Sequence, residues 1–185
     1  MLIVAVVWFG LIVWNFLASK SGNKPGLVPN VTISDSPLQL TAEQLENLNR
    51  NNSNLQPALV EQYINEFRGI NGLPALVHNG ALEKSAELKL NDMVANNYFT
   101  HDSPSGLTPW YFIGQAGYVY KKAGENLAYG NYKDEKLVVD SWMASAAHKE
   151  NLLNPDYRDF GLTIKKVDDF NGSKDVYVIV LHLAH

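Results

Sequence analysis

The chain of 185 residues contains no cysteine. Disulfides, thiolate catalysis and cysteine-based zinc sites are therefore excluded, and a folded domain must be stabilised by its apolar core alone. Basic residues are also few, since 15 Lys and Arg stand against 19 Asp and Glu, a net charge of -4. The pairs Lys121-Lys122 and Lys165-Lys166 are too short to form a phosphate-binding stripe, so nucleic-acid binding is not expected.

Several familiar catalytic patterns are also missing. The chain has no Gly-x-Ser-x-Gly elbow, no phosphate-binding loop and no His-Glu-x-x-His helix. Ser103, Ser105 and Ser145 lie near histidines in the sequence, but such neighbours arise often by chance. A serine hydrolase is therefore not the favoured interpretation.

The first 18 residues differ from the rest of the chain. Residues 2–18 contain one strongly polar side chain, Asn15, and a helix of this length approaches the lower limit for crossing a bilayer. A cleaved signal peptide would begin with basic residues and end in a small-x-small site. This segment has no basic start, and Leu17-Ala18-Ser19 is a poor cleavage site. We therefore predict an uncleaved transmembrane anchor over residues 1–18. Its orientation is less clearly marked, because Lys20 and Lys24 follow it and the positive-inside rule alone would keep that side cytoplasmic.

A change of composition separates this anchor from the folded part of the chain. Residues 19–56 are rich in Ser, Asn and Pro and are typical of a flexible tether. Thr41-Ala42-Glu43-Gln44 could cap one short helix over residues 41–49. The folded domain is expected over residues 57–185.

Four helices are predicted within this domain. Apolar residues recur at helical spacing from Pro57 to Ile70 and again over residues 80–96, where Lys89 is placed on the outward face. Thr108-Pro109 predicts the start of a third helix, which ends at Gly117. A fourth covers residues 134–146.

The C-terminal third has the pattern of β-structure. Residues 160–164 and 176–181 are β-rich runs on either side of Asn171-Gly172, which is a hairpin signal. A third strand is expected between Tyr118 and Tyr129. Helices before and between the strands, and a sheet with two apolar faces, predict an α+β fold: a three-layer α-β-α sandwich with a small antiparallel sheet.

Three motifs carry the polar residues that are best suited to catalysis or metal binding. They are Asn97-Tyr98-Phe99-Thr100-His101, Gly124-Glu125-Asn126-Leu127-Ala128 and Trp142-Met143-Ala144-Ser145-Ala146-Ala147-His148. Two imidazoles and a carboxylate from three segments can hold a divalent cation or transfer a proton if they converge on one cleft. His101, Glu125 and His148 are therefore the candidate catalytic or metal-binding residues, with Zn²⁺ as the metal considered.

The order and wording of these motifs resemble the CAP superfamily, which includes cysteine-rich secretory, antigen 5 and pathogenesis-related 1 proteins (the SCP domain), and in particular its bacterial branch. The resemblance implies the same three-layer sandwich and an extracytoplasmic domain. Animal and plant relatives are disulfide-linked and carry two histidines and two glutamates, of which His101 and Glu125 are matched here. Ser145 and Tyr177 stand in the places of the other two, whereas His148 belongs to the bacterial-type motif.

Each histidine and the glutamate also have a purely structural explanation. A lone histidine before a turn-rich loop, as at His101, is usually inert. Glu125 could accept backbone hydrogen bonds and fix its loop, and His148 could complement the dipole at the end of the fourth helix. His182 and His185 are interpreted as frayed terminal residues rather than as metal ligands.

The favoured function is that of a membrane-anchored, extracytoplasmic binding domain. Its expected partners are the membrane, through the N-terminal helix, and a lipid, small-molecule, divalent-metal or protein ligand. One alternative is a metal-dependent hydrolase or peptidase with Glu125 as general base. A structural envelope protein is the other, because a family fold does not by itself decide a function.

Overall fold

The computed structural model describes residues 54–185. The expected anchor (residues 1–18) and the short helix expected within the tether (residues 41–49) lie outside the described residues. Within residues 54–185, no helix is long and apolar enough to cross a membrane. Leu55 is buried, and the backbone N–H of Gln56 donates to the Glu135 carboxylate at 2.7 Å.

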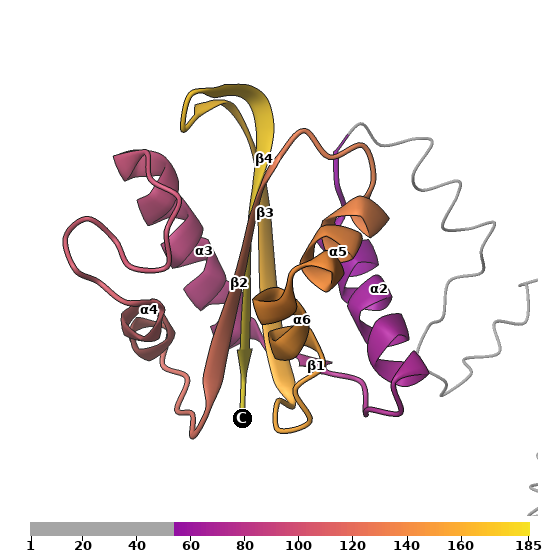
Figure 1. Cartoon of the computed structure of the whole chain (residues 1–185). Coiled ribbons are helices and arrows are strands. Elements are labelled where there is room, and N and C mark those ends of the chain that lie inside the picture. The colour runs from indigo at the N-terminus through magenta and orange to yellow at the C-terminus, as the bar shows by residue number, and fades with distance from the viewer. Residues whose placement is uncertain (1–53) are drawn as a thin grey trace, which may run out of the picture. The chain divides into compact units, whose positions relative to one another are not determined.

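The described chain folds as three layers (Figure 1). A four-stranded sheet in the order β1-β3-β4-β2 forms the middle layer. Helices α3 and α4 cover one face, and α2, α5 and α6 cover the other. The elements in chain order are α2 (Pro57–Ile70), β1 (Val77–His78), α3 (Gly80–Asn96), α4 (Pro109–Gln115), β2 (Ala123–Gly130), α5 (Glu135–Ala144), α6 (Ala146–Leu152), β3 (Asp159–Phe170) and β4 (Ser173–Ala184). The predicted α-β-α sandwich is thus confirmed.

Local signals account for where the helices begin. The Asn79 side chain accepts hydrogen bonds from the first backbone N–H groups of α3, and Asp134 does the same for α5. Proline occupies the first turn of α2 and of α4, where its missing N–H costs nothing. These starts agree with the sequence prediction.

The predicted fourth helix is wrong in one respect, because it is two helices. Ser145 has an extended backbone (φ -93°, ψ 124°), which ends α5 at Ala144 and lets α6 begin at Ala146. His148 therefore lies inside α6 rather than at the end of the preceding helix. The break places its side chain on an element with a different direction, which no residue pattern indicated.

The sheet is mixed rather than purely antiparallel. Strands β3 and β4 form the expected hairpin, with Asn171 (φ 51°) and Gly172 (φ 78°) in the left-handed backbone region that such a tight turn requires. Strand β2 adds to β4 in antiparallel fashion, but β1 pairs with β3 in parallel. A strand of two residues is too short to show a sequence period, so β1 was missed and the antiparallel prediction is corrected.

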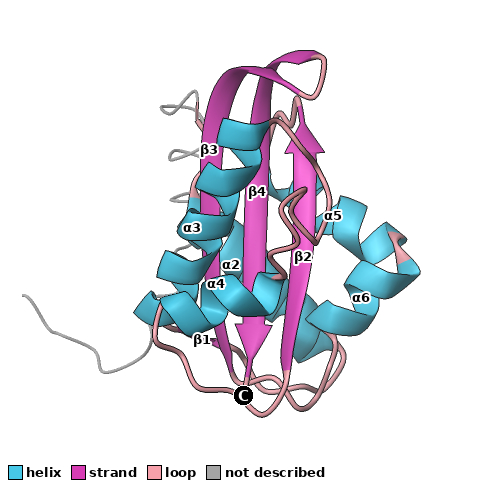
Figure 2. Ribbon diagram, turned by 90° about the vertical axis from the view of Figure 1, so that its left-hand side faces the viewer, coloured by secondary structure: helices cyan, strands magenta, loops and turns pink. Residues whose placement is uncertain are grey.

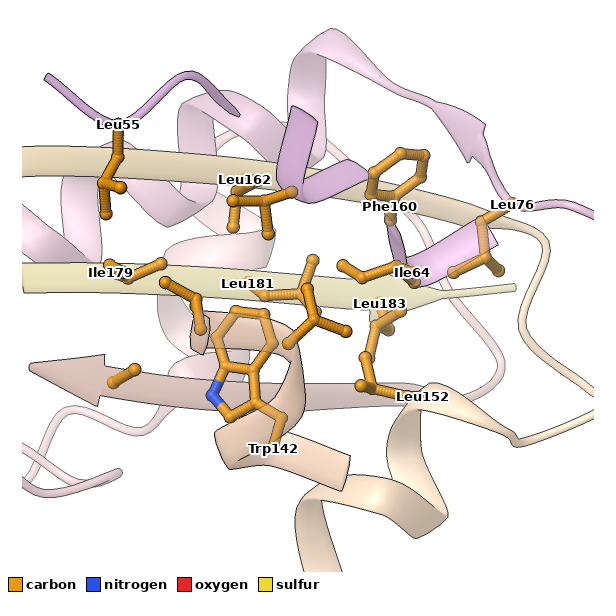
Figure 3. Packing of buried hydrophobic residues seen from close by; sticks show 14 of the residues in the cluster. Leu55, Ile64, Leu76, Trp142, Leu152, Phe160, Leu162, Ile179, Leu181 and Leu183 are labelled. Atoms are coloured by element: carbon orange, nitrogen blue, oxygen red, sulfur yellow. The ribbon is translucent and has the colours of Figure 1, made fainter. Parts of the chain in front are cut away.

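Both faces of the sheet are apolar, as predicted, because side chains alternate along the central strand β4. Ile179, Leu181 and Leu183 pack with the buried indole of Trp142 on the face of α2, α5 and α6 (Figure 3). Val178 and Val180 pack in a second cluster against α3. Helix α3 lies directly on β3, since a Cβ at Gly161 would stand 1.9 Å from the backbone nitrogen of Glu83.

Candidate functional site

A buried carboxylate joins two histidines from distant parts of the chain. Glu125 on β2 accepts a hydrogen bond from His101 Nδ1 at its Oε1 (2.7 Å) and from His182 Nε2 at its Oε2 (3.0 Å). The side chain of Glu125 is 1% exposed, whereas that of His101 is 58% exposed. Glu125 therefore links a solvent-facing imidazole to one inside the sheet.

Strand pairing explains half of this arrangement. Glu125 and His182 are direct cross-strand partners of β2 and β4, so their side chains emerge on the same face, that of α3 and α4. His182 is fully buried in β4, and the interpretation of this residue as a frayed end is wrong. The ring is fixed at both nitrogens, because His182 Nδ1 lies 2.6 Å from the Ser85 hydroxyl of α3.

The other half depends on the chain after α3, which carries His101. Asn97 adopts a left-handed conformation (φ 48°) that ends α3 and returns the chain over the sheet. The buried ammonium of Lys89 then holds this segment by donating to the backbone oxygens of Thr100 (3.0 Å) and His101 (2.6 Å). It also donates to the hydroxyl of Tyr98 (3.0 Å). Lys89 thus fixes the backbone that presents His101.

The sequence prediction that Lys89 points outward is wrong. Amphipathic spacing assumes that one side of a helix faces solvent, but α3 is covered by the sheet on one side and by α4 with the loop after residue 96 on another (Figure 2). A lysine in such a position needs hydrogen-bond acceptors, and here the loop supplies them. No residue pattern marked this side of α3 as buried.

Charge and burial act in opposite directions at this network. Burial would raise the pKa of Glu125, but the hydrogen bonds from His101 and His182, together with the charge of Lys89, hold that pKa below its ordinary value. The hydrogen bond to Glu125 raises the pKa of His101 above its ordinary value despite some burial. Burial lowers the pKa of Lys89, which nearby carboxylates partly oppose. The His101–Glu125 pair is therefore favoured as an imidazolium and a carboxylate.

His148 lies on the far side of the edge strand. Its backbone oxygen accepts from the Asn126 side chain (3.0 Å), so this part of α6 is tied to β2. Burial lowers the pKa of His148, and the positive charge of His101 lowers it further. The two imidazoles are thus close enough to interact electrically, but among residues 54–185 no hydrogen bond joins the His148 ring to Glu125 or His101.

Asn126 and Asn151, neither of which was predicted as a site residue, complete the link between β2 and α6. The Asn151 amide donates to the backbone oxygen of Glu125 (3.1 Å) and to the side-chain oxygen of Asn126 (2.9 Å). Gly124 permits this approach, because a Cβ there would lie 3.0 Å from Asn151 Oδ1 and 2.6 Å from the Tyr157 hydroxyl. Each residue of the Gly-Glu-Asn motif therefore has a structural role: Gly124 allows the close approach of α6, Glu125 binds the two histidines, and Asn126 bonds to α6.

His101, Glu125 and Asn151 border one cleft, which we call the dyad cleft after the His101–Glu125 pair. Its volume is about 350 Å³, and its lining consists of His101, Asp102, Pro109, Trp110, Ala123, Gly124, Glu125 and Asn151. Within the described part of the chain, Nε2 of His101 makes no hydrogen bond, since only Nδ1 is bound to Glu125. The cleft thus offers a fixed imidazole with one nitrogen available to a ligand.

A metal ion would have to compete with existing hydrogen bonds here. Both oxygens of Glu125 already accept from imidazoles, and across residues 54–185 no group of three or more His, Cys, Asp or Glu side chains is arranged to hold a metal ion. A zinc site made of His101, Glu125 and His148 stays a prediction. It would require one imidazole–carboxylate bond to open.

Comparison with known proteins assigns the family. The family model of the cysteine-rich secretory protein family (CAP) matches residues 61–182. The chain belongs to this family. The match includes every residue that lines the dyad cleft and confirms the resemblance inferred from the motifs.

Two bacterial relatives share part of this sequence. The YkwD protein of Bacillus subtilis is 40% identical over 103 residues, which are 56% of this chain and 40% of that protein. The membrane protein YlbC of the same organism is 36% identical over 75 residues, or 40% of this chain and 21% of that protein. The matched segment is therefore less than half of either relative's length.

Two solved structures have the same fold. An extracellular SCP-domain protein from Bacillus anthracis has a TM-score of 0.59 at 25% identity, covering 80% of this chain and 44% of that one. An outer surface protein from Borrelia burgdorferi has a TM-score of 0.61 at 27% identity, covering 69% of this chain and 90% of that one. Several relatives of this CAP domain are thus named as extracellular, surface or membrane proteins.

A histidine that the motif comparison did not select meets Glu125 in the structure. Tyr177 was placed where animal and plant relatives have their second histidine, yet it packs in the core with Trp142 and Ile179. His182 instead meets Glu125 from the same strand. The signal that could have identified it is a histidine at the alternate position of a long apolar run, where only a buried and bonded imidazole is tolerated.

Proposed function

We propose that this chain is a membrane-anchored, extracytoplasmic CAP domain that binds a small ligand in the dyad cleft. The observation that carries the proposal is the fixed geometry of His101, whose Nδ1 is bound to a buried carboxylate while Nε2 stays available at the cleft. An imidazole oriented in this way makes a directional hydrogen bond to a ligand at little entropic cost.

The arrangement of supporting residues favours binding. Lys89 holds the backbone of His101, and Asn151 holds that of Glu125. A residue needed only for a loop turn would not require a fully buried ammonium and a second buried imidazole behind it. Such pre-organisation is typical of ligand sites.

A fragment screen by NMR tests this proposal. The full-length protein would be titrated with a library of small polar, apolar and charged fragments, and shift changes mapped to His101, Trp110 and Asn151. Cleft binders should lose affinity in His101→Ala. A surface control, Lys84→Ala on the exposed side of α3, should bind normally. A library with no cleft binder at all would contradict a binding role and favour the structural envelope alternative.

A metal-dependent hydrolase is the second candidate, and the imidazole–carboxylate pair is the observation that favours it. An imidazolium held by a carboxylate can donate a proton as a general acid, and once it has lost that proton it can accept one as a general base. Peptidase and esterase assays with and without added Zn²⁺ test this candidate, with His101→Ala and Glu125→Gln as variants. Activity that both variants retain would exclude the dyad as its source.

The membrane anchor is proposed from the apolar residues 2–18 and is consistent with relatives named as membrane and surface proteins. Intact mass spectrometry of the protein from its native host should show an uncleaved N-terminus in the membrane fraction. A mature chain that starts near Ser19 and is free in the medium would contradict the anchor.

A further inference from the structure

Aromatic side chains gather at one rim of the dyad cleft. Trp110, which lines the cleft, and Tyr111 lie on α4 and are exposed. Tyr120 follows in the loop before β2, and its ring centroid lies 6.3 Å from that of Trp110 at an interplanar angle of 47°. Val119 beside it is 93% exposed. We call Trp110 and Tyr120 the aromatic rim.

The core does not account for the aromatic rim. Helix α4 buries Pro109, Phe112 and Ile113 on its inner side, so Trp110 and Tyr111 are not needed to attach it. Large apolar groups left in water beside a cleft are a common mark of a binding surface. The position of Trp110 in both the rim and the cleft lining makes the two one continuous surface.

The other lining residues specify what such a ligand must offer. His101 Nε2 is available, Asp102 supplies a carboxylate that accepts hydrogen bonds, and Asn151 has both amide hydrogens committed to protein oxygens, which leaves Oδ1 as an acceptor. A ligand that matches them carries several hydroxyl groups. One that also matches the rim carries a flat apolar face.

We propose that the dyad cleft and the aromatic rim together bind a glycan. A pyranose ring has an apolar C–H face, which stacks on Trp110 or Tyr120, and peripheral hydroxyls, which bond to His101, Asp102 and Asn151. A volume of about 350 Å³ lies near the lower end of the ~300–1,000 Å³ found for ligand pockets. It suits one sugar unit in the cleft, with its neighbours lying over the rim. This inference rests on the proposed binding role of the cleft.

Other ligand classes fit this surface less well. An alkyl chain needs apolar walls throughout, but His101, Asp102 and Glu125 line one side. An extended peptide would add to the free edge of β2, but the backbone oxygens of Leu127 and Glu125 are taken by Trp142 Nε1 (3.0 Å) and Asn151 Nδ2 (3.1 Å). Side chains thus cover the edge where strand addition would occur.

Calorimetric titration of the full-length protein with cello-, chito- and oligogalacturonate tetrasaccharides tests the proposal. At least one should bind, and Trp110→Ala and Tyr120→Ala should each weaken binding by roughly tenfold, as expected for aromatic anchors. Trp110→Phe should restore part of the loss. Leu137→Ala, which removes an exposed apolar side chain from α5 on the opposite layer, should have no effect.

The possible failures are distinguishable. If fragments bind the cleft but none of the three tetrasaccharides does, the glycan assignment is wrong and the binding role of the cleft stands. Glycan binding that is unchanged in Trp110→Ala and Tyr120→Ala would overturn the role of the rim. An equal loss in Leu137→Ala would show that the variants act through general destabilisation, which thermal unfolding of each variant reports independently.

Discussion

Replacing Glu125 by Gln should weaken the network around His101 in a pH-dependent way. The carboxylate is buried and accepts from two imidazoles, whereas an amide keeps one acceptor oxygen and presents a donor at the other position. If the oxygen stays with His182, the new N–H₂ group faces His101 Nδ1. His101 must then be neutral, because only an unprotonated Nδ1 can accept.

The expected loss is about 2 kcal/mol of unfolding free energy, since one charge-assisted hydrogen bond of ~1.5–3 kcal/mol is lost and a second is weakened. For a chain of this size that corresponds to a fall in melting temperature of roughly 4–8 °C. The pKa of His101 should also fall, because the hydrogen bond that raises it is the one removed.

The sign of the pH dependence follows from the two shifts. The raised pKa of His101 adds stability that is fully present below its ordinary value of 6.5 and is lost as pH rises through the folded value. The lowered pKa of Glu125 adds stability that is present above its ordinary value of 4.5 and is lost as pH falls through the folded value. Wild type and Glu125→Gln should therefore differ most between these values and less at pH 8.

Urea unfolding at pH 5.5 and pH 8, with NMR titration of the His101 ring, measures both effects. Glu135→Gln is the matched control, because Glu135 is equally buried but accepts a backbone N–H from Gln56 far from the network. It should leave the titration of His101 unchanged. An unaltered His101 pKa in Glu125→Gln would refute the assigned dyad.

Three further predictions concern separate parts of the molecule. Lys89→Met should lower the unfolding free energy by about 1–3 kcal/mol, because backbone oxygens lose their donor, and it should raise the pKa of His101. The control Lys84→Met, on the exposed side of α3, should change the unfolding free energy by less than about 0.5 kcal/mol. Urea unfolding and NMR titration measure both effects, and a Lys89→Met variant as stable as wild type would contradict the role of Lys89. Gly161→Ala should lower the unfolding free energy by roughly 3 kcal/mol or more, or prevent folding, because the added Cβ would overlap the α3 backbone. Gly114→Ala is the control, since a Cβ there meets open space. Equal melting temperatures of the two variants would be inconsistent with the packing of α3 on β3. Calorimetry with Zn²⁺ should show one site that weakens as pH falls and is lost in His101→Ala, and retention in that variant would exclude the dyad cleft.

The layered architecture was available from the sequence because it depends on local patterns. Apolar residues recur every three to four positions in α2 and α3, and Asn171-Gly172 marks the β3–β4 turn. Two apolar faces on one sheet require helices on both sides. The family motifs added His101 and Glu125, which the structure brings together.

The partners of those two residues were decided only by tertiary structure. His182 meets Glu125 because the register of β2 against β4 makes them cross-strand neighbours, and register is set by the whole sheet rather than by either strand. Lys89 is buried because α4 and the loop after α3 cover a side of the helix that its own spacing marks as exposed. An amphipathic pattern describes one helix against one surface, so it identifies core positions well. It does not identify a polar residue that is enclosed between several elements.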